Sequence, residues 1–554
     1  MARFVIFVCI LGISILGYAQ ETKNVTFDSP FDFPLLLSAN FGELRPNHFH
    51  NGLDIKTQGS VGKPIHSVAE GYVSRIMVLH GGYGQAVFVT HPNGFTSVYG
   101  HVVAFAPEIQ EYVRTYQYEH ETFVCDIRLD ASVFPVERGE VIALSGNEGA
   151  SAGPHLHLEL RRNDNGDYID PMPYFKKYLT DTKAPVGQWL CLYPMKGKGV
   201  VNGSSEKKIV SVKNLQQQSF SAWGQIYAGI SGKDYMDGTN NFYGIHSVTL
   251  YVDSMKVFSS VTNEVSADEN RMINAFVDYD ELIRSRRLFM QSYKLPGNTL
   301  RLLQVDNHRG VITIDKEKDY YFCYELEDNF GNKRNYRFIV QGKKQDIPDP
   351  QDEGNQILRW NSNNIVQEPG MEWIVPKGVL YDDAVLDTHV EGDSNSISFS
   401  YCLDAGNIPL HKYSTLMIGI RHKPIVDTTK YYIEQKVGDR VSSVGGTYAD
   451  GWIKASIRSL GTFTVAVDTV APRVIPIGES GWRASRNIRF RVSDGETGIA
   501  DYKVYVDGKF VLFGLKKGIL VIQDPQKIQR GVPHEMEVIV TDGCGNETRK
   551  QYNF

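Results

Sequence analysis

The residues best suited to metal chemistry lie in segment 153–160, which reads GPHLHLEL. Its polar and apolar residues alternate strictly, as in a β-strand whose successive side chains point to opposite faces. His155, His157 and Glu159 therefore share one face of the predicted strand, and three leucines share the other. Two imidazoles on one face make half of a metal site, so the remaining ligands must come from elsewhere in the chain.

Segment 50–54, which reads HNGLD, is the obvious source of those ligands. In an extended chain His50 and Asp54 lie on the same face, and Gly52 between them leaves room for a second strand to approach closely. Two such strands side by side would present three or four nitrogen and carboxylate ligands. This donor set suits Zn²⁺, which in catalytic sites takes three protein ligands and leaves a position for water.

Three motifs in a fixed order resemble the LytM or lysostaphin-type zinc metallopeptidases, the M23 family of peptidoglycan endopeptidases. They are FGELRPNHFHNGLDI at 41–55, VYGH at 98–101 and GPHLHLEL at 153–160. Together they are a strong signal, whereas any one of them alone would be weak. The resemblance covers the first third of the chain, to about residue 171.

The resemblance implies a role for each of five residues. It implies that His50, Asp54 and His157 hold Zn²⁺, and that His155 and His101 face the bound water and the substrate without ligating the metal. A neutral imidazole beside the metal can take a proton and steady the oxyanion. The implied reaction is hydrolysis of an amide by a zinc-activated water, without a covalent intermediate.

Two neighbours of these residues leave alternatives open. His48 forms an HxH pair with His50, but the spacing to Gly52 and Asp54 selects His50 as the ligand and leaves His48 at the rim or behind the ligands. Glu159 either accepts the imidazole N–H of His157, as carboxylates behind metal ligands do, or is a solvated strand residue.

A serine-hydrolase alternative fails on its context. Segment 149–153 fits the G-x-S-x-G pattern, but a nucleophile elbow follows a strand and opens a helix, whereas this segment leads into the predicted strand of the HLH motif. Ser151 is therefore predicted to be a loop residue, and no HExxH motif is present in the chain.

The elements that must position these residues are short strands separated by glycine turns, over residues 27–177. No helical period of useful length appears there, so we expect an antiparallel β-fold with the site in a groove, in agreement with the family. An insertion at about 107–131, rich in Tyr, Glu and Arg, departs from the family pattern. Because it leaves the strand that ends at His101, we expect it close to the groove, as a lid or as a surface loop.

The rest of the chain contains one module used twice. The sequences DTKAP at 181–185 and DTVAP at 468–472 match, and each copy ends in a D-x-x-G-N turn. These features resemble immunoglobulin-like β-sandwiches and predict domains at 181–342 and 468–554, with an insertion near 264–294 in the first copy. We expect a polar linker at 343–356 and a further β-sandwich at 357–467. The predicted fold class is thus mainly β, with about three sandwich domains after the peptidase domain.

Composition and length bound the compartment and the partners. The 554 residues suffice for three or four domains, and a formal net charge of −6 excludes a general nucleic-acid binder. Residues 1–20 have the pattern of a cleaved secretory signal, too short for a membrane span, so we expect export to the periplasm or cell envelope and no transmembrane span after cleavage.

The sequence thus predicts a secreted zinc endopeptidase that cuts peptide cross-links of peptidoglycan, with peptide stems as its substrate. Its sandwich domains would space the enzyme or contact envelope proteins. Two other functions stay open: a non-catalytic LytM-like regulator that activates other wall hydrolases, and an adhesion or scaffold protein in which the sandwiches carry the function. All five site positions are filled in this chain, which favours the enzyme.

Overall fold

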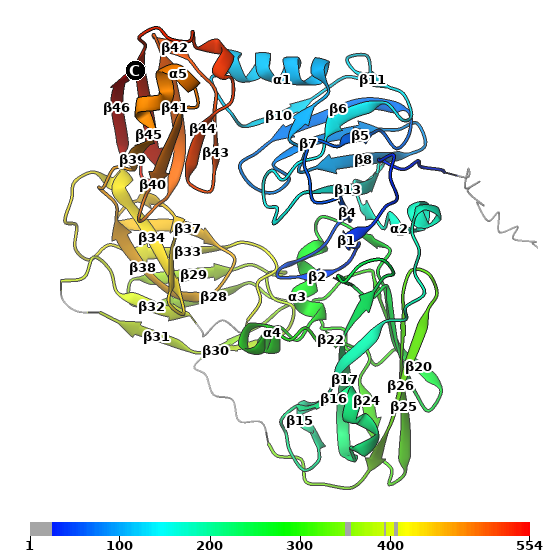
Figure 1. The fold of residues 1–554 in the computed structure, drawn as a ribbon. Helices are drawn as coiled ribbons and strands as arrows, with labels where there is room; N and C mark the ends of the chain where they lie inside the picture. Colours follow the sequence, from blue (N-terminus) through cyan, green and yellow to red (C-terminus); the bar gives the residue numbers. More distant parts are fainter. Residues whose placement is uncertain (1–24, 350–355, 393–394, 404–407) are drawn as a thin grey trace, which may run out of the picture.

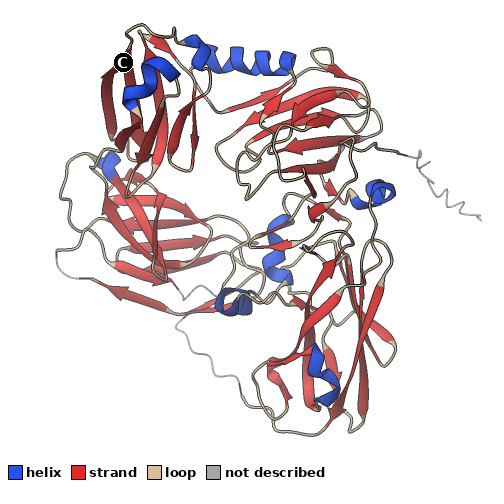
Figure 2. Ribbon diagram, in the orientation of Figure 1, coloured by secondary structure: helices blue, strands red, loops and turns tan. Residues whose placement is uncertain are grey.

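A computed structural model describes residues 25–349, 356–392, 395–403 and 408–554. The predicted signal segment 1–20 and residues 350–355 of the predicted linker lie outside this range. Strands dominate, with a few short helices between them (Figure 2), so the predicted mainly β fold class is confirmed. No helix among the described residues is both long and apolar enough to span a bilayer.

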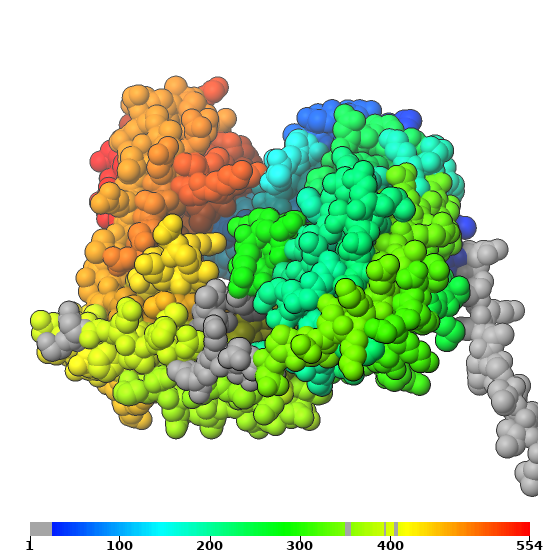
Figure 3. Space-filling model, turned by 90° about the horizontal axis from the view of Figure 1, so that it is seen from below, coloured from blue at the N-terminus to red at the C-terminus, as the bar shows by residue number. Residues whose placement is uncertain are grey.

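Four bodies follow one another along the chain and lie around a ring (Figure 1). We call residues 25–180 the first domain, 181–342 the first module, 356–467 the middle module and 468–554 the last module. The last module, orange to red in Figure 1, lies beside the first domain, so the first and last of the four bodies are neighbours. Figure 3 shows the same arrangement from below, with the first and middle modules in contact.

The first domain is built on one antiparallel sheet in the order β1-β4-β13-β8-β7-β6-β10. The strands of this sheet are β1 (Leu37–Ala39), β4 (Leu53–Lys56), β13 (His155–Arg162), β8 (Phe95–Gly100), β7 (Gln85–Thr90), β6 (Gly71–Val78) and β10 (Cys125–Arg128). At its margins, β11 (Pro135–Val136) pairs with β6, and β14 (Tyr168–Ile169) pairs with β13.

Two small sheets complete this domain. One has the order β5-β12-β9, and the other is the hairpin of β2 and β3. Their strands are β5 (Pro64–His66), β12 (Val141–Leu144), β9 (Ala104–Phe105), β2 (Leu44–Arg45) and β3 (His48–Phe49). The three leucines of β13 are fully buried in the domain core, as the alternation predicts. They share the face of this central strand that packs against the other apolar side chains of the core.

A helix, α1 (Pro107–Glu119), occupies most of the predicted insertion, so the expectation of a domain without a helix is wrong. Pro107 suits the first helical position, where its missing N–H has no partner to lose. Ile109, Val113 and Gln117 are spaced by four residues and form the buried face. Only two of these three residues, Ile109 and Val113, are apolar, so the sequence shows no clear apolar stripe at helical spacing. Short α2 (Met172–Phe175) and η1 (Lys176–Tyr178) close the domain.

The first module contains a large sheet in the order β16-β15-β17-β26-β25-β19-β20-β23, with β18, β22 and β24 also paired to β17. Among the described strand pairs, β17 with β26 is the parallel one. The strands are β15 (Val186–Val201), β16 (Lys208–Ser211), β17 (Phe220–Tyr235), β18 (Phe242–Tyr243), β19 (Ser247–Val252), β20 (Met255–Val261), β22 (Met290–Gln291), β23 (Leu303–Val305), β24 (Ile312–Ile314), β25 (Asp319–Glu327) and β26 (Lys333–Gly342).

The insertion of the first module reaches back to the first domain. It contains β21 (Glu264–Val265), η3 (Asn270–Met272), α3 (Ile273–Phe276) and α4 (Tyr279–Ser285), while η2 (Val212–Gln217) lies elsewhere in the module. Strand β21 pairs with β14 and so continues the sheet of the first domain across the boundary. The two bodies are therefore joined by backbone hydrogen bonds as well as by the chain.

The middle module is a sandwich whose two five-stranded sheets share one core. One sheet has the order β28-β29-β33-β37-β36, the other β31-β32-β38-β34-β35, and β27 pairs with β30 beside them. The elements are β27 (Gln356–Leu358), β28 (Asn364–Glu368), β29 (Met371–Val375), β30 (Ala384–Leu386), β31 (Thr388–Glu391), β32 (Ser400–Leu403), β33 (Ser414–Gly419), η4 (Thr428–Lys430), β34 (Tyr431–Val437), β35 (Arg440–Gly445), β36 (Thr447–Ala449), β37 (Trp452–Ile457) and β38 (Gly461–Val467).

The last module is a smaller sandwich, also with one shared core. Its four-stranded sheets have the orders β39-β40-β44-β43 and β42-β41-β45-β46. The elements are β39 (Arg473–Ile477), η5 (Glu479–Gly481), α5 (Trp482–Ser485), β40 (Arg489–Ser493), β41 (Ile499–Val506), β42 (Lys509–Phe510), β43 (Phe513–Lys516), β44 (Ile519–Ile522), η6 (Pro525–Lys527), β45 (Glu535–Asp542) and β46 (Glu547–Asn553).

Candidate metal centre

Strand pairing brings the HLH motif and the HNGLD motif together. Strands β4 and β13 are antiparallel neighbours, and their register places His157 directly opposite Asp54. Gly52 permits this approach, since a Cβ atom at this position would lie 2.4 Å from the carbonyl oxygen of Leu158. On the other side of β13, His157 is opposite Gly100, so the next residue, His101, arrives at the same place.

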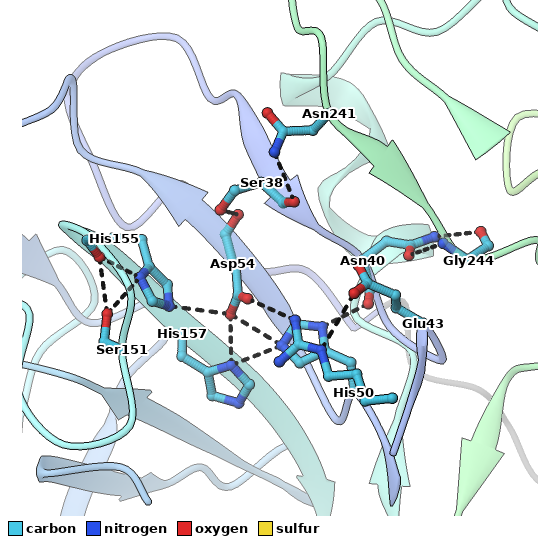
Figure 4. A network of polar contacts seen from close by, with 12 residues as sticks. Ser38, Asn40, Glu43, His50, Asp54, Ser151, His155, His157, Asn241 and Gly244 are labelled. Atoms are coloured by element: carbon cyan, nitrogen blue, oxygen red, sulfur yellow. Dashed lines mark hydrogen bonds and ion pairs between the residues drawn. The ribbon is translucent and has the colours of Figure 1, made fainter. Parts of the chain in front are cut away.

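His50, Asp54 and His157 form one buried group (Figure 4). Asp54 Oδ1 lies 3.0 Å from His50 Nε2 and 2.8 Å from His157 Nδ1, and these two nitrogens are 3.0 Å apart. Tetrahedral ligands at zinc bond lengths are separated by about 3.3 Å. Two nitrogens and one carboxylate oxygen at this spacing therefore fit a single small divalent cation.

The outward nitrogens of both imidazoles are held by acceptors, which fixes which nitrogen faces the centre. His50 Nδ1–H donates to the backbone carbonyl of Asn40 (2.6 Å), and His157 Nε2–H donates to Glu159 Oε1 (3.0 Å). The lone pairs of His50 Nε2 and His157 Nδ1 are therefore directed to the centre, as metal binding requires. Sequence reasoning did not include Asn40, because a backbone carbonyl has no signature in the residue type.

Glu159 is fully buried, so the alternative of a solvated strand residue is wrong. It also accepts the Tyr83 hydroxyl (2.6 Å) and two Arg161 nitrogens (2.8 and 2.7 Å). Burial opposes its charge, but Arg161, His157 and Tyr83 together lower the pKa of Glu159 to about 2. Tyr83 and Arg161 were missed from the sequence; Arg161 shares the strand face of the motif two residues further on, which was the one available signal.

Electrostatics keep Asp54 ionised despite its burial. Burial would raise its pKa, but His50, His155 and His157 hold the pKa of Asp54 well below its usual range. Arg45 donates to the second oxygen, Asp54 Oδ2, at 3.1 Å. The carboxylate is thus charged and oriented, with Oδ1 left toward the two ligand imidazoles.

His101 and His155 lie beside this group, with ring centroids 4.7 Å apart. His101 Nδ1–H donates to the carbonyl of Glu148 (2.7 Å), and His155 Nδ1–H donates to the carbonyl of Gly153 (2.8 Å). Burial and the neighbouring imidazoles lower the pKa of His101 to about 4. His101 is therefore neutral near pH 7, with an unprotonated Nε2.

Ser151 lies 3.2 Å from His155 Nδ1, and His155 Nε2 lies 3.5 Å from Asp54 Oδ1, which is the outline of a Ser-His-Asp triad. A triad serine needs an imidazole nitrogen that accepts its proton. Here Nδ1 already carries a proton for the carbonyl of Gly153, to which the Ser151 hydroxyl also donates (2.9 Å). Ser151 is thus not activated by this contact, in agreement with its prediction as a loop residue.

A groove of about 1080 Å³ passes over the centre. Its lining includes Asp54, His101 and His155 from the first domain, and Asn241 and Phe242 from the first module. The Asn241 amide donates to the Ser38 carbonyl at 3.3 Å, which ties this wall to β1 (Figure 4). Two bodies therefore share the groove, which sequence reasoning did not anticipate.

The insertion 107–131 does not line this groove, so the expectation that it lies there is wrong. Instead it contacts the last module: the Tyr118 hydroxyl donates to Asp524 (3.0 Å) and Arg114 pairs with it (3.3 Å). His48 is exposed and is outside both the groove lining and the ligand group.

Two family models match the chain. The model described as peptidase family M23 matches residues 48–118, and the model described as a Zu5-like domain matches residues 355–468. The M23 match therefore lies within the first domain and includes His50, Asp54 and His101.

Curated relatives agree with this assignment over part of their length. An uncharacterized metalloprotease of Haemophilus influenzae is 32% identical over 158 residues, which are 28% of this chain and 27% of the relative. The DD-carboxypeptidase/endopeptidase Mpg of Neisseria meningitidis is 32% identical over 123 residues, 22% of each chain. The chain thus spans about a quarter of the length of these relatives.

Among solved structures, the catalytic domain of the prophage-encoded M23 protein EnpA from Enterococcus faecalis is similar. The identity is 23%, with 26% of this chain and 95% of that chain covered, and the TM-score is 0.20.

Proposed function

We propose that the chain is an exported, zinc-dependent endopeptidase that hydrolyses peptide cross-links of peptidoglycan. The observation that carries the proposal is the group of His50, Asp54 and His157, whose donor atoms lie about 3 Å from one another with both outward imidazole nitrogens held by acceptors. The M23 match and the names of the relatives support the substrate class.

In this proposal His50, Asp54 and His157 hold the metal. When bound, Zn²⁺ supplies Lewis-acid polarisation of a carbonyl and lowers the pKa of water to about 7. Since Nδ1 of His101 and of His155 carries the ring proton, the Nε2 of either ring can accept the proton of the attacking water, and that same ring returns this one proton to the leaving amine. The neutral His101 ring adds no charge that would repel the metal.

The charges of the groove lining support a peptide with a free carboxylate as substrate. The groove lining contains two cations, Arg45 and Lys56, and two carboxylates, Glu43 and Asp54, and Arg45 is paired with both carboxylates. Lys56 would therefore be the lining cation that holds a free carboxylate of a peptide stem.

The test is muropeptide analysis after incubation of purified peptidoglycan with the full chain. We expect cleaved cross-links with added Zn²⁺, none after chelation, and none with His157→Ala. His48→Ala is the matched control, because it removes the neighbouring histidine of the HxH pair without touching the ligand group, and should cleave as the natural chain does.

The alternative functions give different results in the same experiment. A folded, zinc-loaded chain that leaves every cross-link intact would contradict the enzyme and favour the regulator, which is then tested by adding a second wall hydrolase. Binding of intact sacculi by residues 181–554 without cleavage by the full chain would favour the adhesion protein.

A further inference from the structure

We propose that the first module contains a second metal site, in which Asp181, Asp234 and Asp328 bind one Ca²⁺. One carboxylate oxygen of each residue lies within 4.8 Å of the others. The three residues come from separate segments: the chain that enters the module, the end of β17, and the turn between β25 and β26. All three are buried, with exposed fractions of 8%, 4% and 2%.

Two of these carboxylates have an oxygen that nothing in the described chain satisfies. Asp181 Oδ2 and Asp234 Oδ1 are buried without a hydrogen-bond partner. No lysine or arginine of the described residues forms an ion pair with any of the three; Lys183, the cation next in sequence, directs its Nζ to the Met236 carbonyl (2.9 Å) and toward Asp237 (3.6 Å). Buried charge without a partner costs several kcal/mol, so unsatisfied buried carboxylates point to a missing cation.

The three carboxylates lie close enough to repel one another, with one oxygen of each within 4.8 Å of the others. Like charges at this separation cannot all remain ionised without a counter-charge. A divalent cation supplies that counter-charge.

The donor set selects the class of cation. All available donors are carboxylate oxygens, which suit hard cations, whereas Zn²⁺ favours imidazole and thiolate. Ca²⁺ accepts six to eight oxygen ligands in flexible geometry, while Mg²⁺ requires a near-ideal octahedron. Three carboxylates from three separate segments suit the more tolerant ion.

The last module contains the matching residues Asp468, Asp494 and Asp542, which form a comparable group. There the protein itself satisfies the oxygens: the Thr497 hydroxyl donates to Asp468 Oδ2 (2.5 Å), and the backbone N–H groups of residues 496–498 donate to Asp494 Oδ2. None of its carboxylate oxygens is a buried, unpartnered atom in the described chain. The proposal is therefore confined to the first module.

The position of the site gives it a mechanical role at the boundary with the first domain. Asp181 follows η1, the last element of that domain, and Asn329 in the turn of Asp328 donates to Asp170 Oδ2 at 2.6 Å. A cation that ties Asp181 to this turn holds the junction on both sides. We infer that Ca²⁺ fixes the first module, which contributes Asn241 and Phe242 to the groove, against the first domain.

The test uses the full chain, with Zn²⁺ held constant, and Ca²⁺ as the probe. Calorimetric titration should show Ca²⁺ binding that Asp234→Asn weakens by at least about tenfold, since one of three charged ligands is lost. The melting temperature of the natural chain should rise with Ca²⁺, and that of Asp234→Asn should not. Asp494→Asn is the matched control and should respond as the natural chain does.

Folding of the variant is checked by its behaviour without calcium. Because Asp234→Asn removes repulsion between buried carboxylates, it should melt at the same or a higher temperature than the natural chain in calcium-free buffer. Asp181→Asn provides a second variant with the same expected loss. The proposal would be overturned if the natural chain did not respond to Ca²⁺, or if both variants responded to Ca²⁺ as strongly as the natural chain does. It would also be overturned if the natural chain responded to Mg²⁺ as strongly as to Ca²⁺.

Discussion

The chemistry of the centre depends on which nitrogen of each imidazole carries a proton. Four histidines meet there, and one nitrogen of each ring donates its proton to an acceptor. A backbone carbonyl is the acceptor for His50, for His101 and for His155, and the Glu159 carboxylate is the acceptor for His157. Without these acceptors either tautomer would form, and the lone pairs would not be directed to the centre. The acceptors therefore matter as much as the ligands.

Glu159→Gln tests this dependence at one residue. The variant keeps the shape of the side chain but removes the charge behind His157 and leaves Arg161 without its carboxylate partner. We expect zinc affinity to fall about 10- to 100-fold, the range found when a group behind a metal ligand is changed. Chelator competition measures the affinity, and peptidoglycan hydrolysis follows it.

Tyr83→Phe is the matched control for that variant. It removes one hydrogen bond to Glu159 (2.6 Å) and retains the charge, so its loss of affinity should be clearly smaller. Equal zinc affinity of Glu159→Gln and the natural chain would contradict the role of the carboxylate.

At the scale of elements, the site is a property of strand register. His157 meets Asp54 because β13 and β4 pair in one register, and a shift by one residue would turn every polar side chain of β13 to the other face. Both faces of β13 are buried, so the leucines and the polar side chains fix the register together. Gly52, directly before β4, lies so close to β13 that a Cβ atom there would be 2.4 Å from the Leu158 carbonyl oxygen.

Gly52→Ala tests this packing. A Cβ atom 2.4 Å from the Leu158 carbonyl must push β4 away from β13, so we expect a loss of about 1–3 kcal/mol in the free energy of unfolding. Zinc affinity should fall as well, because Asp54 and His157 lie across these strands. Denaturant titration measures the first and chelator competition the second.

Gly153→Ala serves as the control, since no atom lies within 4 Å of a Cβ there and the residue is close to the same centre. If both variants lose the same stability and affinity, close approach at Gly52 is not the cause.

The sequence was sufficient to predict the strand of the HLH motif and the mainly β fold, and it named five residues that the structure brings together, because alternation and motif spacing are local. It was insufficient to predict contacts between residues that are far apart in the chain and meet only in the folded structure. Tyr83 reaches Glu159 from a separate glycine loop, and the carbonyls of Asn40 and Glu148 act through the backbone. Phe242 enters the groove wall from another body, which no local pattern encodes.

At the scale of the whole molecule, contacts between neighbours connect the four bodies. Asn270 of the first module accepts the Phe49 N–H beside the ligand His50. Arg271 of the same insertion donates to the Leu410 carbonyl of the middle module, and Lys430 there donates to the Cys544 carbonyl of the last module.

The last module returns to the first domain through several polar and aromatic contacts. Glu121 accepts Tyr505 (2.7 Å) and pairs with Lys503 (3.2 Å), and Lys516 pairs with Glu148 (2.9 Å). The carbonyl of Glu148 is the acceptor for His101, so this contact reaches the loop that orients a residue of the centre.

Combining Asp524→Ala with Lys516→Ala should release the last module from the first domain. The change removes the partner of Tyr118 and Arg114 and the ion pair with Glu148, at a cost of about 1–3 kcal/mol for the groups left unpaired. We expect a larger radius of gyration by small-angle scattering. Glu537→Ala removes a different ion pair of the same module, with Arg549, and should leave the radius unchanged.

An unchanged radius for the double variant would mean that the contacts of Glu121 with Tyr505 and Lys503, together with apolar contacts, are enough to hold the module. Phe123 and Tyr502, which both contact the His80 ring, would then be the residues to change next.

The return of the last module to α1 makes the four bodies a closed linkage instead of an open string. In an open string each joint turns independently, whereas in a closed one a turn at any joint must be matched by turns at the others. The groove wall at Phe242 cannot then swing outward on its own: opening it requires coordinated movement of the middle and last modules, or release at α1. The stiffness of the groove wall is thus set by all four junctions together, including those farthest from His50, Asp54 and His157.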